Sequence, residues 1–139
     1  DEDCLFLNIW RPLAALPDGN LTVMVWIHGG AFIEGDAGDN ESPNTYNGCG
    51  LAARHNVIVA SMNYRLGFLG FAAFVNAKGG VDANWGFEDQ REALRWLQRE
   101  LSSFGGDPSK VTIFGESAGA QSVWHHLASK RSTGLFRAA

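Results

Sequence analysis

The chain has 139 residues, with 11 Lys and Arg against 15 Asp and Glu, so its formal net charge is −4. Its 45% hydrophobic and 19% charged residues are typical of a globular domain and exclude a disordered chain, collagen, a coiled coil or a disulfide-dense mini-protein. The longest uncharged apolar stretches, 21–33 and 66–77, are too short to cross a bilayer, and Lys and Arg do not cluster, so we expect neither a membrane span nor nucleic-acid binding.

Apolar runs separated by turn residues predict the elements of the first half. In chain order we expect a strand over 4–10, a turn over 17–20, a strand over 21–27, a polar loop over 34–50, a short helix over 51–55 and a strand over 57–62. The run 21–27 is almost continuously apolar, which is typical of a strand buried on both faces.

The second half alternates helix and strand. Residues 84–104 carry leucines at spacings of three and four, which predicts an amphipathic helix that ends at Gly105-Gly106. We expect a turn at Asp107-Pro108, a buried strand over 111–114 and a helix over 120–129. Such an alternation predicts an α/β fold with a mostly parallel sheet covered by helices on both faces.

The two ends and the cysteines bear on how much of a protein this is. The chain opens at Asp1 without Met, and residues 134–139 run toward what could be another strand, so we expect an internal piece of a longer protein. Cys4 and Cys49 could bridge each other, pair outside these residues or stay reduced. No Cys or His spacing predicts a metal site.

The segment Gly115-Glu-Ser-Ala-Gly119 fits the pattern G-x-S-x-G between a predicted strand and a predicted helix. Glycines on either side of Ser117 let strand and helix approach closely, and the helix N-terminus presents backbone N–H groups to a developing oxyanion. This context indicates that Ser117 is a nucleophile. The alternative is that Ser117 merely caps the helix.

A second glycine-rich segment, His28-Gly-Gly-Ala-Phe32, follows the predicted strand 21–27. A loop of such small residues can turn its backbone amides toward a ligand, and acyl transfer needs fixed N–H donors for its tetrahedral oxyanion. The alternative is a plain glycine turn. His28 could lie near the site, but we favour a role in shaping the loop.

The base that Ser117 requires is not evident. His125 and His126 follow Ser117 on the same predicted helix, about 12–13 Å away along its axis. Glu116, next to the serine, points elsewhere on a tight turn and is expected to add negative potential or hydrogen bonds. Residues 118–139 contain no Asp or Glu. Since serine alone is a poor nucleophile, we expect little or no turnover from residues 1–139 by themselves.

Five ordered motifs resemble the type-B carboxylesterases, the family that includes the cholinesterases. They are Glu2–Asn8 (EDCLFLN), His28–Phe32 (HGGAF), Asn63–Phe68 (NYRLGF), Asn84–Arg91 (NWGFEDQR) and Phe104–Ala120 (FGGDPSKVTIFGESAGA). Two positions depart from the commoner family pattern: Ala31 replaces the third glycine of the loop, and Phe87 replaces a leucine.

The resemblance implies an α/β-hydrolase fold, with residues 1–139 forming the N-terminal part of the sheet within a partial catalytic domain. It implies a serine esterase that hydrolyses a small-molecule ester through an acyl-enzyme, without cofactor or metal. The implied residues are Ser117 as nucleophile, the amides of Gly30, Ala31 and Ala118 as oxyanion donors, and Glu116, Gly29 and His28 near the site. The family's acid, a Glu, and base, a His, lie further downstream.

Other implications of the resemblance concern the surroundings of the site. The family pairs the cysteine matching Cys4 with an upstream cysteine, and such a disulfide would favour export. Arg65 and Asp89 are expected in buried ion pairs below the site. Trp85 and Phe32 are expected either to wall the acyl pocket or to pack in the core.

Two rival functions stay open on the sequence. A non-catalytic adhesion protein of the same fold would lack the serine or part of the triad, whereas Ser117 is present here. An amidase, peptidase or lipase would use the same nucleophile. The substrate, the oligomeric state and the compartment are not given by these residues.

Overall fold

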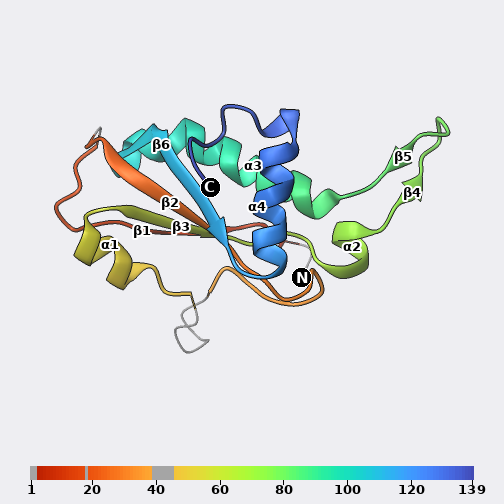
Figure 1. Cartoon of the computed structure of the whole chain (residues 1–139), viewed down its shortest axis with the longest axis horizontal. Helices are drawn as coiled ribbons and strands as arrows, with labels where there is room; N and C mark the ends of the chain where they lie inside the picture. Colours follow the sequence, from red (N-terminus) through yellow and green to blue (C-terminus); the bar gives the residue numbers. More distant parts are fainter. Residues whose placement is uncertain (1–2, 18, 39–45) are drawn as a thin grey trace.

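The computed structural model describes residues 3–17, 19–38 and 46–139 (Figure 1). Glu2 of the first motif, Asp18 of the predicted turn and residues 39–45 of the predicted loop lie outside the described residues. The elements are β1 (Leu7–Trp10), β2 (Leu21–Ile27), α1 (Cys49–His55), β3 (Ile58–Met62), α2 (Gly67–Phe71), β4 (Phe74–Val75), β5 (Val81–Asp82), α3 (Trp85–Glu100), a 3₁₀ turn (Leu101–Phe104), β6 (Gly106–Gly115), α4 (Ala118–Ala128) and a second 3₁₀ turn (Lys130–Ser132).

Four strands form one mostly parallel sheet in the order β1-β3-β2-β6. β2 pairs in parallel with both β3 and β6, and β1 pairs antiparallel with β3. The end of the chain returns to β6, where the Ile113 N–H donates to the Ala138 carbonyl at 3.0 Å. The arrows of β2 and β6 point to the same end of the sheet, where α4 begins (Figure 1). The expected parallel sheet is confirmed.

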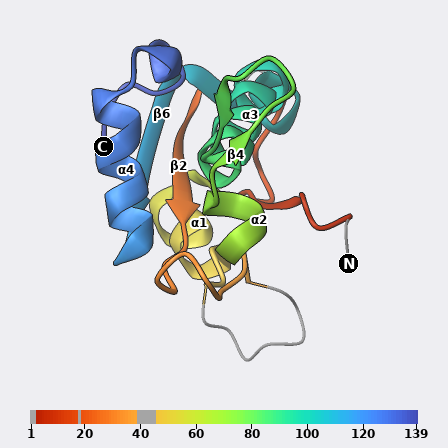
Figure 2. The ribbon, with the colours of Figure 1, turned by 90° about the vertical axis from the view of Figure 1, so that its right-hand side faces the viewer.

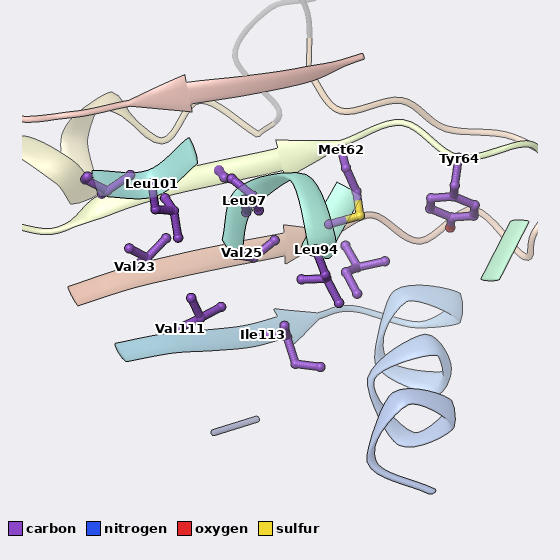
Figure 3. Close-up of a cluster of buried hydrophobic side chains, with 12 residues drawn as sticks. Val23, Val25, Met62, Tyr64, Leu94, Leu97, Leu101, Val111 and Ile113 are labelled. Atoms are coloured by element: carbon purple, nitrogen blue, oxygen red, sulfur yellow. The ribbon is translucent and has the colours of Figure 1, made fainter. Parts of the chain in front are cut away.

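The core lies between the sheet and α3. Figure 3 shows side chains of the strands gathered against those of α3 and the turn that follows it; the labelled ones include Val23, Val25, Ile113, Leu94, Leu97 and Leu101, all fully buried. α4 packs beside α3, whose Gln90 it contacts, and α1 covers the opposite face of β3. Helices therefore lie on both faces, as predicted.

β2 matches its predicted bounds but not its predicted burial. Val23, Val25 and Ile27 are completely buried against α3, whereas Met24 and Trp26 on the other face are only half-buried. Among the described residues, α1 covers only part of that face. The apolar run thus indicated a strand correctly, and its two faces differ because helix cover differs.

Three further predictions needed correction. The first strand begins at Leu7, three residues later than predicted, and β6 begins at Gly106, five residues before the predicted start. Pro108 lies where the pairing with β2 is irregular, between the partners Leu21–Gly106 and Val23–Val111, which is where a strand tolerates proline. The helix α2 and the hairpin β4–β5 were not predicted, since residues 66–77 are apolar without a helical or strand period.

Two remaining observations concern membrane-spanning helices and disulfide bonds. No helix in the described ranges is both long and apolar enough to cross a membrane. Cys4 is half-buried and Cys49 is exposed, and both are free, so these two cysteines do not bridge each other.

Candidate active site

Ser117 stands at the sharp turn that joins β6 to α4, and the residue is exposed. Its backbone angles, φ 54° and ψ −118°, are strained for a residue with a side chain. The flanking glycines make the turn feasible: a Cβ on Gly119 would lie 2.0 Å from the Ile27 carbonyl oxygen, and one on Gly115 would lie 2.6 Å from the Gly119 backbone. Ser117 is therefore held at the exposed turn by close backbone packing, and only glycine fits at positions 115 and 119.

The segment after β2 forms a tight loop of left-handed residues. Gly30, Ala31 and Phe32 have φ values of 101°, 53° and 63°. The Gly30 carbonyl closes the loop by accepting the N–H groups of Ile33 at 3.0 Å and Glu34 at 3.1 Å. A Cβ on Gly30 would lie 2.0 Å from the Glu34 carbonyl oxygen, so only glycine fits there.

This loop and the serine turn meet because β2 and β6 are parallel neighbours, with Ile27 opposite Gly115. A Cβ on Gly29 would lie 2.6 Å from Glu116 Oε2 and 3.2 Å from Ser117 Cβ. Within the described part of the chain, the N–H groups of Gly30, Ala31 and Ala118 donate to no other backbone group. The predicted site residues thus lie together, and these three N–H groups have no backbone acceptor among the described residues.

His28 supports the loop from below. It is 1% exposed, and its Nδ1–H donates to the Gly29 carbonyl at 2.7 Å. Its ring stacks on Tyr64 with a centroid distance of 4.4 Å, and the Tyr64 hydroxyl donates to the His28 carbonyl at 2.7 Å. Burial lowers the pKa of His28 and raises that of Tyr64, so both stay neutral near pH 7. The favoured interpretation, that His28 shapes the loop, agrees with this geometry.

Tyr64 is a site residue that sequence reasoning missed. It belongs to the motif Asn63–Phe68 that carried part of the resemblance, but no role was assigned to it. Its target, the His28 carbonyl, is 36 residues away in the chain and becomes a neighbour only through the pairing of β2 with β3. The one available signal was that the tyrosine directly follows a buried strand at the same edge of the sheet.

The other acidic and basic side chains near Ser117 in sequence, and the remaining histidine, are placed as follows. Glu116 is exposed, and its backbone carbonyl accepts the Gly119 N–H at 2.8 Å. His126 is buried against Gln90 of α3, and the His125 ring stacks on Phe87 at 3.8 Å. Both histidines therefore face α3, away from any role as the base of Ser117. His55 is exposed at the end of α1.

Arg65 and Asp89, expected in buried ion pairs below the site, pair with each other, but only Asp89 is buried: the Arg65 side chain is 36% exposed. Arg65 Nη2 lies 2.6 Å from Asp89 Oδ1, and Arg65 Nε donates to Oδ2 at 2.7 Å. The hydrogen bond to Asp89 raises the pKa of Arg65. At the start of α2 the Gly67 N–H donates to the Phe32 carbonyl at 2.6 Å. Figure 2 shows α2 beside the loop that follows β2.

The aromatic residues of this region pack mainly on one another. The Phe32 ring lies 4.6 Å from that of Phe71 and 5.8 Å from that of Phe87. The guanidinium carbon of Arg65 lies over the Trp85 ring, 5.4 Å from the ring centroid. Of the two expected roles for Phe32, packing in the core is the one these contacts favour. Among the described residues, no group of three or more His, Cys, Asp or Glu is placed to hold a metal ion.

Known proteins resemble this chain in sequence and in structure. A family described as "Carboxylesterase family" matches residues 1–139. Cholinesterase 1 of Branchiostoma lanceolatum is 51% identical over 138 residues, covering 99% of this chain and 36% of the relative. Pyrethroid hydrolase Ces2e of Rattus norvegicus is 49% identical over 138 residues, 99% of this chain and 23% of the relative. A PNB esterase structure matches with a TM-score of 0.88 at 45% identity, covering 99% of this chain and 28% of that one.

Proposed function

The chain belongs to the carboxylesterase family and forms part of an α/β-hydrolase fold, and from this premise we propose that the protein hydrolyses carboxylic esters through a serine acyl-enzyme. The chain spans from 23% to 36% of the length of the relatives named above. We propose that residues 1–139 are the part of the catalytic domain that carries the nucleophile and the oxyanion donors.

The observation that carries the proposal is the meeting of an exposed, strained Ser117 with unused backbone donors. The Ser117 hydroxyl attacks the ester carbonyl carbon, and the carbonyl oxygen becomes an oxyanion. The N–H groups of Gly30, Ala31 and Ala118 receive that oxyanion. In known enzymes the loss of one such donor costs about 3–4 kcal/mol of transition-state stabilisation. Collapse of the intermediate expels the alcohol and leaves an acyl-serine, which water then hydrolyses.

The proton of the Ser117 hydroxyl must pass to a general base. His28 is held under the loop by Gly29 and Tyr64, and His126 is held by Gln90 and Ser132, so neither is available. We propose that the base and its acidic partner are a His and a Glu outside residues 1–139, as the family resemblance implies. On this account residues 1–139 alone have little or no turnover.

The test is labelling of the full-length protein with a fluorophosphonate, followed by mass spectrometry of the modified peptide. We expect an adduct on Ser117, hydrolysis of short 4-nitrophenyl esters by the wild type, and loss of both in Ser117→Ala. Ser103→Ala, which changes an exposed serine at the end of the turn after α3, is the matched control and should react as the wild type does.

Each outcome separates the proposal from its rival. If the wild type forms no adduct and hydrolyses no ester although it is folded by circular dichroism, the proposal is wrong and a non-catalytic adhesion protein becomes the better account. If Ser117→Ala keeps full activity, another residue is the nucleophile. Comparing ester and amide substrates with the same acyl group then distinguishes an esterase from an amidase.

A further inference from the structure

A continuous series of buried polar groups joins α3 to the first turn of α4. Arg91 Nε lies 3.3 Å from Ser132 Oγ, which lies 2.9 Å from His126 Nδ1. His126 Nε2 lies 3.0 Å from Gln90 Oε1, and Gln90 Nε2 lies 3.0 Å from Ser122 Oγ. Ser122 Oγ in turn lies 3.0 Å from the carbonyl oxygen of Ala118. All five side chains are at most 2% exposed.

The Ala118 end of the series fixes the direction of the hydrogen bonds as far as His126. The Ala118 carbonyl can only accept, so Ser122 donates to it and accepts from the Gln90 amide. Gln90 Oε1 then accepts from His126 Nε2, which carries the hydrogen. When His126 is neutral its Nδ1 accepts, so the Ser132 hydroxyl donates to Nδ1 and accepts from Arg91 Nε.

That arrangement requires a neutral His126. Burial is the main cause that lowers the pKa of His126 to about 4, with further lowering from His125 and Arg91 and an opposing effect of Glu88. The Arg91 guanidinium pairs through Nη1 with Glu88 at 2.6 Å. The series is therefore complete and uniform in direction near pH 7, and hydrogen bonds aligned in this way strengthen one another.

The series ends next to the strained serine. Ala118 follows Ser117 directly, and its N–H is one of the three donors proposed for the oxyanion. A strained conformation such as that of Ser117 persists only where its surroundings over-determine it. On one side the contact of Gly115 and Gly119 with Ile27 supplies this restraint. On the other side the series ties the first turn of α4 to α3.

We propose that Gln90, Ser122, His126 and Ser132 are positioning residues that act as one unit, holding the first turn of α4 so that Ser117 and the Ala118 N–H keep the geometry that the transition state needs. The inference rests on the proposed function and adds to it a set of residues that touch no substrate. It requires that loss of any link lowers kcat more than it raises KM, because a misplaced donor weakens the transition state and not substrate binding.

The test uses the full-length protein and a 4-nitrophenyl ester. We expect Ser122→Ala, the link next to Ala118, to lower kcat about tenfold with little change in KM, as loss of about 1.4 kcal/mol of transition-state stabilisation does. Ser132→Ala, four links away from Ala118, should lower kcat by a smaller factor. The double variant should lose no more than Ser122→Ala alone, because residues that act as a unit are not additive.

Ser61→Ala is the matched control. Ser61 is as buried as Ser122, and its hydroxyl also donates to a backbone carbonyl, that of Ala37 at 2.6 Å. We expect its thermal midpoint to fall as much as that of Ser122→Ala while kcat stays unchanged. If Ser61→Ala loses as much kcat, or the effects of Ser122→Ala and Ser132→Ala multiply, the side chains act independently through stability and the inference is wrong.

Failure of the inference and failure of the proposed function give different results. A wild type that forms no fluorophosphonate adduct on Ser117 overturns both, beginning with the function. A wild type that is labelled, with Ser122→Ala labelled at the same rate and turning over within twofold of it, overturns the positioning role alone. Should Ser122→Ala not fold, Ser132→Ala and its fall in kcat at constant KM decide the question.

Discussion

Two junctions of opposite chemistry hold α4 in place. At its N-terminus, the backbone of Gly115 and Gly119 lies against the Ile27 carbonyl with no room for a Cβ. Along its side, α4 is joined to α3 by polar side chains such as His126 and Gln90. The first junction cannot adapt, since no side chain there can rotate away. The second consists of side chains that can rotate, exchange partners or take up a proton. We therefore expect the two junctions to fail in different ways.

The largest effect is expected at the backbone junction, from Gly119→Ala. The new Cβ would meet the Ile27 carbonyl oxygen at 2.0 Å, and backbone on both sides would have to move. Overpacking of this kind costs several kcal/mol, and we expect the full-length variant either to fail to fold or to lose activity by at least about a hundredfold. Expression yield, thermal midpoint and fluorophosphonate labelling measure the effect.

Gly50→Ala is the control for that prediction. Gly50 lies in α1, and a Cβ there would meet nothing within 4 Å. Because alanine favours the helix over glycine, this variant should gain about 0.5–1 kcal/mol of unfolding free energy and keep its activity. Equal losses from the two substitutions would show that glycine content in general, and not the close approach at Gly119, governs stability.

The polar junction between α3 and α4 should lose stability as the pH falls. The folded protein holds His126 neutral because burial lowers its pKa from 6.5 to about 4. The unfolded chain takes up the proton near pH 6.5, so the stabilisation is complete above that pH and is lost as the pH falls toward 4. A shift of this size corresponds to about 3 kcal/mol of unfolding free energy. Urea denaturation of the full-length protein between pH 7 and pH 4 measures the slope.

His126→Gln should flatten that slope without removing it entirely. Burial also lowers the pKa of His125 and His28, so these side chains contribute in the same direction. His55→Gln, at the exposed end of α1, is the matched substitution of a histidine outside the junction, and its slope is measured beside that of His126→Gln. A slope that is identical in the wild type and His126→Gln would show that the α3–α4 junction does not titrate in this range.

The two junctions also differ in how far the sequence predicts them. The backbone junction can be predicted from local motifs, because Gly115–Gly119 and His28–Phe32 each follow an apolar strand. Parallel pairing of these two strands brings both motifs to one edge of the sheet. Their proximity could be predicted before any coordinates were known. The exposure of Ser117 also follows from the sharp turn between strand and helix.

The polar junction could not be predicted in the same way. Gln90 and Ser132 are 42 residues apart in number and carry no common motif; they meet at His126 only after α3 and α4 pack side by side. From the sequence, the distance of His126 from Ser117 along the helix excludes it as the base but predicts no other role for it. Likewise, Tyr64 becomes a support of the loop only through sheet pairing. Long-range polar contacts depend on helix packing, which periodicity alone does not specify.

The smallest effect should come from polar groups on the solvent side of α3. Arg99 Nη1 lies 3.5 Å from Glu92 Oε1, and both side chains are more than half exposed. Arg99→Ala should therefore change the unfolding free energy by less than about 0.5 kcal/mol, and 0.5 M salt should remove even that.

Arg91, on the same helix, is 2% exposed and donates to Ser132. Because Arg91→Ala would leave Ser132 without its buried donor and Glu88 with Arg131 alone, we expect it to cost about 3 kcal/mol in the same urea titration. Similar costs for the two arginines would mean that charge count, and not burial within the junction, sets the contribution of α3.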